Sequence, residues 1–171
     1  MFFRRRRADS PSASTVNDEL LGIVREHLPD EADEEEVCLL AAVAALVACV
    51  AYADGVYHAD EVRAVRRMFD RVHDLPPRGV EAMMALLDER IADLARGEVH
   101  EHARLLKQGL TREARAEVLD VLMDVAAADG QISILETELL RRITNLMGLD
   151  PNDYVHAQSR HRDKLAVLQG D

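Results

Sequence analysis

Apolar residues along the chain recur at the spacing of helices and not in the strict alternation of strands. Val62, Val65, Phe69 and Val72, for example, fall on one stripe of a helix. No sustained run of alternating apolar and polar β-branched residues is present. The sequence therefore predicts an all-α fold, a compact bundle of about seven to eight helices. The expected helices cover about 15–28, 33–53, 59–73, 78–95, 99–107, 111–128 and 133–148, and a last helix begins at Pro151.

The segment 37–53 carries no charged residue, which raises the question of a membrane span. Its seventeen residues are near the lower limit, about 17–25, for a helix that crosses a bilayer. Seven of the seventeen are alanine, and acidic residues flank the segment at 33–36 and at Asp54. A helix that is apolar on every side also suits the centre of a helical bundle. A buried central helix is the better interpretation.

The chain contains an internal repeat with a period of 75 residues. When 50–76 is aligned with 125–151, nine of the 27 positions are identical, against roughly one or two expected from composition. Apolar positions such as Met68 and Ile143 also correspond. Each half is thus predicted to form a helix, an Asp-Gly turn, a second helix, a proline and a third helix. The expected organisation is a basic tail at 1–14, a leading amphipathic helix at 15–30, and a helical domain at 31–168 with halves at about 33–95 and 111–168.

The repeated element is Ala-Asp-Gly with a Glu seven residues after the Asp. It reads Tyr-Ala-Asp-Gly-Val-Tyr-His-Ala-Asp-Glu at 52–61 and Ala-Ala-Asp-Gly-Gln-Ile-Ser-Ile-Leu-Glu at 127–136. With these two copies in order, the chain resembles the TerB-like family of tellurite-resistance proteins. The resemblance implies a role in cytoplasmic stress-response systems, often near a membrane, with divalent-cation binding by acidic residues. Carried over to this sequence, the metal ligands are Asp54, Glu61, Asp129 and Glu136.

The same residues also have a purely structural interpretation. In an Asp-Gly turn, Gly supplies a positive φ and Asp binds nearby backbone N–H groups. Ser133 and Glu136 form a predicted capping box, and His58 and Glu61 occupy the equivalent positions with a poorer cap. A carboxylate in a first turn also suits the positive end of the helix dipole. On this interpretation the motif is only a tight corner in an adaptor that binds no metal.

The functional interpretation depends on how the two halves are placed. An approximate two-fold axis would bring the turns together, and four adjacent carboxylates repel one another unless a hard cation lies among them. An all-oxygen site favours Ca²⁺, Mg²⁺ or Mn²⁺ over Zn²⁺. Asp60 and Asp124 are further candidate ligands. The motif is not an EF-hand, because a twelve-residue loop with acidic residues at alternating positions is absent.

The formal net charge of −11 argues against nucleic-acid binding by the body of the protein, because an acidic surface repels phosphates. The exception is the run of four arginines at 4–7. No apolar run follows it, so it is not a secretory signal. We expect a disordered, solvated tail, which also allows a weak contact with anionic lipid through Phe2 and Phe3.

Cys38 and Cys49 are the only cysteines. On one helix they would lie about 16 Å apart, too far for a disulfide within the molecule. They are therefore predicted to be small core residues of a protein in a reducing compartment, which here means the cytoplasm.

No catalytic constellation stands out, so an enzyme is not expected. The sequence has no nucleophile elbow, no phosphate-binding glycine loop and no Cys/His spacing typical of catalysis. His100, His102, His156 and His161 have no cysteine partner nearby and lie on charged segments, so they are predicted to be solvated surface residues rather than zinc ligands.

A protein partner is expected in place of a substrate. A compact acidic bundle with basic faces could dock partner helices or basic tails. The basic positions are Arg63, Arg66, Arg67, Arg141 and Arg142, of which Arg66 and Arg67 recur as Arg141 and Arg142. The alternative is that these charges are only solvated, as charged residues on outer helix faces usually are.

Overall fold

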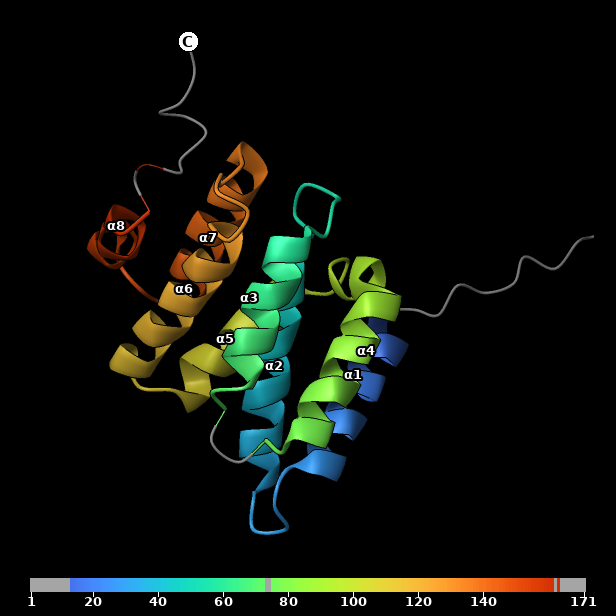
Figure 1. The fold of residues 1–171 in the computed structure, drawn as a ribbon. Helices are drawn as coiled ribbons and strands as arrows, with labels where there is room; N and C mark the ends of the chain where they lie inside the picture. The colour runs from blue at the N-terminus through green and yellow to red at the C-terminus, as the bar shows by residue number, and fades with distance from the viewer. Residues whose placement is uncertain (1–12, 73–74, 162, 164–171) are drawn as a thin grey trace, which may run out of the picture.

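The computed structural model describes residues 13–72, 75–161 and 163 (Figure 1). Within these residues the chain forms eight helices and no strand, so the predicted all-α bundle is confirmed. The helices are α1 (Ala13–His27), α2 (Glu34–Ala51), α3 (Ala59–Phe69), α4 (Pro77–Leu94), α5 (Val99–Gly109), α6 (Arg112–Ala126), α7 (Ile134–Leu146) and α8 (Pro151–Ser159). Of the basic tail predicted at 1–14, residues 1–12 lie outside the described residues, and 13 and 14 begin α1.

Helix α2 is the centre of the bundle. A capping box starts it: the Asp33 carboxylate accepts the Glu36 N–H at 2.9 Å, and the Glu36 carboxylate accepts the Asp33 N–H at 3.2 Å. Leu46 and Val50 have no exposed surface, and helices α1, α4, α5, α6 and α7 all pack against α2. The predicted buried central helix is confirmed. None of the described helices is long and apolar enough to cross a membrane.

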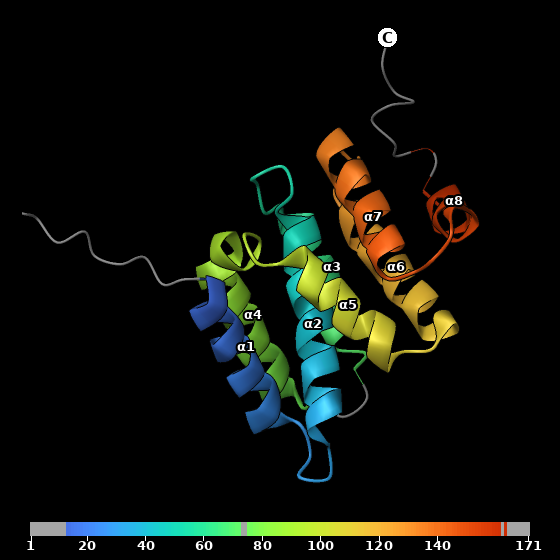
Figure 2. The same cartoon turned by 180° about the vertical axis from the view of Figure 1, so that it is seen from behind.

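The leading helix shares this core. α1 lies beside α4 in both views and packs against both α4 and α2 (Figures 1 and 2). Leu20 and Val24 of α1 are fully buried in the contact. Burying two such side chains contributes about 3–6 kcal/mol relative to leaving them in water. α1 is therefore part of the same core as the repeat.

The internal repeat is visible as a pseudo-two-fold arrangement of four helices. In Figure 1, α6 lies beside α3, and in Figure 2, seen from behind, α2 and α7 take the corresponding places. Helix α3 ends at Phe69 and not near 73 as expected. The reason is that the chain tightens into i→i+3 turns, in which the N–H groups of Arg71 and Val72 donate to the carbonyls of Met68 and Phe69.

Candidate functional site

The first Asp-Gly corner joins α2 to α3. Gly55 has a φ of 86°, a conformation that favours glycine. Asp54 Oδ1 accepts the N–H of Val56 at 2.9 Å, which closes the turn. Glu61, in the first turn of α3, accepts the backbone N–H of His58 at 2.8 Å through Oε2. One oxygen of each acidic side chain is thus used to hold the corner.

The second corner joins α6 to α7 and repeats the same geometry. Gly130 has a φ of 100°, and Asp129 Oδ1 accepts the N–H of Gln131 at 2.9 Å. Glu136 Oε2 accepts the N–H of Ser133 at 2.7 Å, and Ser133 Oγ accepts the N–H of Glu136 at 3.2 Å. The predicted capping box at Ser133 is confirmed.

The two corners meet at His58. Its Nε2 lies 3.9 Å from Asp54 Oδ2 and also 3.9 Å from Asp129 Oδ2. The aspartate oxygens that face His58 are those that do not hold the turns. Acidic residues from the two halves of the repeat therefore lie close to one imidazole nitrogen, which is consistent with an approximate two-fold relation of the corners.

The two glutamates lie beneath this surface. Glu61 is 3% exposed and Glu136 is 4% exposed. Burial raises the pKa of Glu61 to about 8, and the charges of Glu136, Asp129 and Asp54 act in the same direction, against the His58 N–H hydrogen bond. Burial likewise raises the pKa of Glu136, with Asp54 and Asp129 adding to the effect and hydrogen bonds from Ser133 opposing it. The four predicted residues thus form one electrostatically linked group, which we call the carboxylate cluster.

The cluster is not arranged as a closed metal site. Among the described residues, no three His, Cys, Asp or Glu side chains already surround a point that could hold a metal ion. The two suggested assisting ligands face elsewhere: Asp60 forms an ion pair with Arg63, and Asp124 Oδ1 lies 2.8 Å from His161 Nε2. The role of the cluster as a set of metal ligands stays a prediction.

Sequence reasoning missed two neighbours of the cluster. His58 was expected only as a poor helix cap, yet its side chain lies between the two corners. The Tyr57 hydroxyl is buried with no hydrogen-bond partner in the described part of the chain. Burial and the nearby charges of Glu61 and Asp88 raise the pKa of that hydroxyl. The one available signal was the position of both residues between Asp54 and Glu61.

The family model for tellurite resistance protein TerB matches residues 40–159, which is well over half of the chain and includes both Asp-Gly corners. This chain belongs to the TerB family. Searches among curated proteins and among solved structures gave no significant match. The resemblance inferred from the two Asp-Gly…Glu elements is thereby confirmed.

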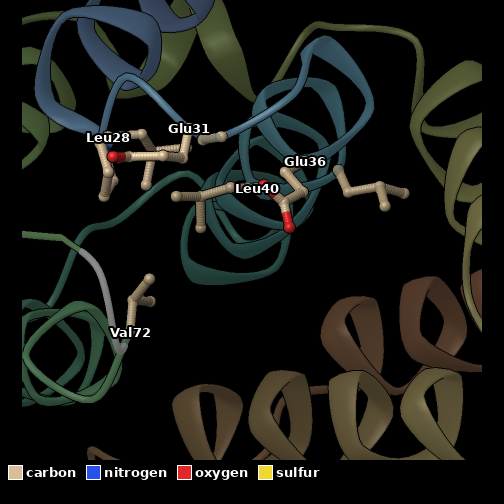
Figure 3. Close-up of a pocket in the computed structure, with 8 residues that line it drawn as sticks. Leu28, Glu31, Glu36, Leu40 and Val72 are labelled. Carbon is tan, nitrogen blue, oxygen red and sulfur yellow. The ribbon is translucent and has the colours of Figure 1, made fainter.

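A separate apolar cavity of about 600 Å³ lies at the opposite end of α2 in this TerB domain (Figure 3). Leu28, Leu40 and Val72 line it, with Glu31 and Glu36 among its polar residues, and no member of the carboxylate cluster contributes. The cavity and the cluster are therefore different features of the surface.

The histidine and cysteine predictions have mixed outcomes. His102 is buried at 9% exposure, so its predicted place on the solvated surface is wrong. It lies on the inner face of α5 with Val99, Ala103 and Leu106, and this helical spacing was the signal that could have placed it. The two cysteines are both free, as expected, and Cys49 lies in the predicted core, whereas Cys38 is only half-buried.

Proposed function

We propose that this TerB-family protein is a non-enzymatic, tellurite-resistance-type interaction module of stress-response systems, and that the carboxylate cluster binds a divalent cation. The proposed ligands are Asp54, Glu61, Asp129 and Glu136. The observation that supports this most directly is the position of His58 Nε2, 3.9 Å from an aspartate oxygen of each corner. It means that small side-chain movements can bring carboxylates from both halves to a shared ion.

The electrostatics of the cluster also favour a cation. Glu61 and Glu136 are buried beside two aspartates, and this arrangement penalises their ionised forms. A divalent ion reverses the penalty, because it favours deprotonated ligands. Carboxylate oxygens are hard ligands, so Ca²⁺, Mg²⁺ or Mn²⁺ fits this donor set better than Zn²⁺.

The proposal places this protein in the cytoplasm with a protein partner and without a nucleic-acid or small-molecule substrate. The net charge of −11 supports the exclusion of nucleic acid. A weak contact with anionic lipid through the arginines at 4–7 stays a prediction, because those residues lie outside the described part of the chain.

The second candidate function is an adaptor without metal. It is favoured by the hydrogen bonds of the corners themselves: each of the four carboxylates accepts a backbone N–H at 2.7 to 2.9 Å. Turn closure and helix capping therefore account for every member of the cluster. On this view the acidic pairs stabilise two corners and bind nothing.

A cation titration separates the two functions. Chelator-treated protein would be unfolded by heat, followed by circular dichroism, with Ca²⁺, Mg²⁺, Mn²⁺ or Zn²⁺ added separately. An ion present at a hundred times its dissociation constant adds about 2.7 kcal/mol, or roughly 5–10 °C for a domain of this size. We expect such a shift with one hard cation.

The matched variants identify the site. Asp54→Asn with Asp129→Asn keeps an acceptor oxygen for each turn and removes two charges, so it should abolish the shift. Asp18→Asn with Asp30→Asn removes two exposed charges outside the cluster and should leave the shift unchanged. If no ion raises the unfolding temperature of the wild-type protein, the adaptor without metal is the correct function.

A further inference from the structure

Helix α5 breaks the pseudo-two-fold symmetry of the bundle. It packs against α2 and α7, and Figure 2 shows it lying between them. The repeat relates α2 to α6 and α7 to α3, so an equivalent helix would lie between α6 and α3. In Figure 1, α5 is seen behind the space between α6 and α3, and no described helix lies on the viewer's side of that space. Among the described residues, a helix therefore covers one half of the repeat and none covers its counterpart.

Residue exposure agrees with this comparison. Leu46 of α2 and Ile143 of α7 have no exposed surface. Their repeat equivalents, Val121 of α6 and Met68 of α3, are only half-buried. The same apolar positions are thus sealed on the side that α5 covers and partly open to solvent on the other.

The open side is a groove of about 360 Å³ between α3 and α6, which we call the α3–α6 groove. Its apolar lining includes Ala64, Met68 and Val121. Arg67 and Arg71 also line it, and within the described residues neither guanidinium forms an ion pair or a hydrogen bond, unlike those of Arg63 and Arg66. The groove is apolar along its floor and positively charged on its α3 side.

Arg67 of α3 and Arg71, which follows the end of α3, differ from the other basic residues of that helix. Arg63 pairs with Asp60, and Arg66 pairs with Glu81. In a chain with a net charge of −11, two arginines without an acidic partner beside an apolar groove are an exception. The acidic residue of the groove, Asp124, is already hydrogen-bonded to His161 at 2.8 Å.

We propose that the α3–α6 groove binds an acidic amphipathic helix of a partner protein. The pseudo-symmetry indicates a helical ligand, because α5, a helix of eleven residues, occupies the equivalent position between α2 and α7. The partner helix would present apolar residues at i, i+4 and i+7, as α5 does with Val99, Ala103 and Leu106. Acidic residues on one flank would pair with Arg67 and Arg71, which gives specificity and a faster encounter. This inference names the partner class of the proposed interaction module, and it is independent of cation binding.

The test uses two stapled helical peptides and the full-length, chelator-treated protein. The acidic probe is the chain's own segment 98–110 carrying His100→Glu, Arg104→Glu and Lys107→Glu, which lie along one flank of the helix. The basic probe has Lys at the same three positions. Binding is followed by the backbone amide signals of the protein in two-dimensional NMR. We expect the acidic probe to shift the signals of Met68, Val121 and Val125, and the basic probe to leave them unchanged.

Charge reversal then tests the recognition. Arg67→Glu with Arg71→Glu should weaken the acidic probe at least tenfold and allow the basic probe to bind. The control, Arg63→Glu with Arg96→Glu, makes the same change in net charge outside the groove and should keep the binding of the acidic probe. Equal weakening in both double variants would show only long-range repulsion and would overturn the proposal.

Three other results would also overturn it. The first is that the acidic probe shifts none of the amide signals of the groove residues, or shifts the signals of Leu46 and Ile143 and not those of the groove. The second is that groove signals change without any peptide when Leu165 and Leu168 are replaced by Ser, which would make the chain's own C-terminal segment the occupant. The third is a dependence of these signals on protein concentration, which would indicate a second copy of the chain. The Asp54→Asn, Asp129→Asn variant should bind the acidic probe normally, so failure of this proposal and failure of the cation site are distinguishable.

Discussion

Replacing Glu61 by Gln should remove a pH dependence from the stability of the fold. Glu61 is 3% exposed, and burial together with three neighbouring acids raises its pKa from an ordinary value of 4.5 to about 8. Between these two values the unfolded chain has released the proton that the folded protein still holds. The stability contributed by the protonated carboxyl is therefore complete below pH 4.5 and is lost as the pH rises toward 8.

The size of the effect follows from the two pKa values. The free energy of unfolding changes with pH by at most about 1.4 kcal/mol per pH unit. Over the whole window from pH 4.5 to 8, the loss of stability is therefore at most about 5 kcal/mol. The total stability of a domain is about 5–15 kcal/mol, so even half of this ceiling is measurable. Glutamine keeps a carbonyl oxygen for the His58 N–H and does not titrate in this range.

The assay is urea unfolding with chelator present, followed by circular dichroism at several pH values from 5 to 8.5. The free energy of unfolding of Glu61→Gln minus that of the wild type should increase steadily with pH. Glu138→Gln removes an exposed carboxylate from α7 and should leave the wild-type pH dependence in place. Parallel curves for the wild type and Glu61→Gln across this range would refute the argument that burial keeps this acid protonated.

Three further predictions test the fold. In urea unfolding, Gly55→Ala should destabilise the protein by about 1–2 kcal/mol, because the φ of Gly55 is 86°. Gly22→Ala, inside α1 with open space around a Cβ, should instead stabilise the protein by about 0.5–1 kcal/mol. Losses of the same size in both variants would contradict this. Leu46→Ala should lower the free energy of unfolding by about 2–5 kcal/mol, since the side chain is fully buried in α2. Iodoacetamide should modify Cys38 in the native protein and spare Cys49, which mass spectrometry of the digested protein would show, because burial raises the pKa of the Cys49 thiol to about 12.

Local features of this fold could be predicted from the sequence because they depend on neighbours along the chain. The apolar run at 37–53 indicated a central helix, and α2 is buried there on nearly every side. Ser133 and Glu136 indicated a cap, and both hydrogen bonds of that cap are present. Turns and caps require only residues within about four positions of one another, and a sequence displays these directly.

Features that depend on distant residues were harder to predict. The repeat implied that the corners are related, but no pattern shows that the side chain of His58 lies between Asp54 and Asp129, residues 75 positions apart. His102 was misplaced for a different reason. Its charged neighbours suggested an exposed segment, whereas its spacing from Val99 and Leu106 places it on the buried stripe of α5. Helical spacing is the better guide in such segments, because a polar residue on the inner stripe is buried with it.

The repeat also explains why the cluster and the α3–α6 groove have different characters. A pseudo-two-fold axis doubles every contact that both halves make, so the corners, which meet each other, bring like charges together. α5 and the end of α4 that leads into it cover only one half, so the positions beneath them can differ between the halves. Cys49 is 2% exposed, and its thiol points to the carbonyls of Leu94 and Ala95, whereas its repeat equivalent Asp124 is exposed. A carboxylate at the Cys49 position would be buried without a counter-charge. Asp124, by contrast, contacts His161 at 2.8 Å. The same position of the repeat therefore carries an uncharged thiol where neighbouring segments cover it and a carboxylate where it is exposed.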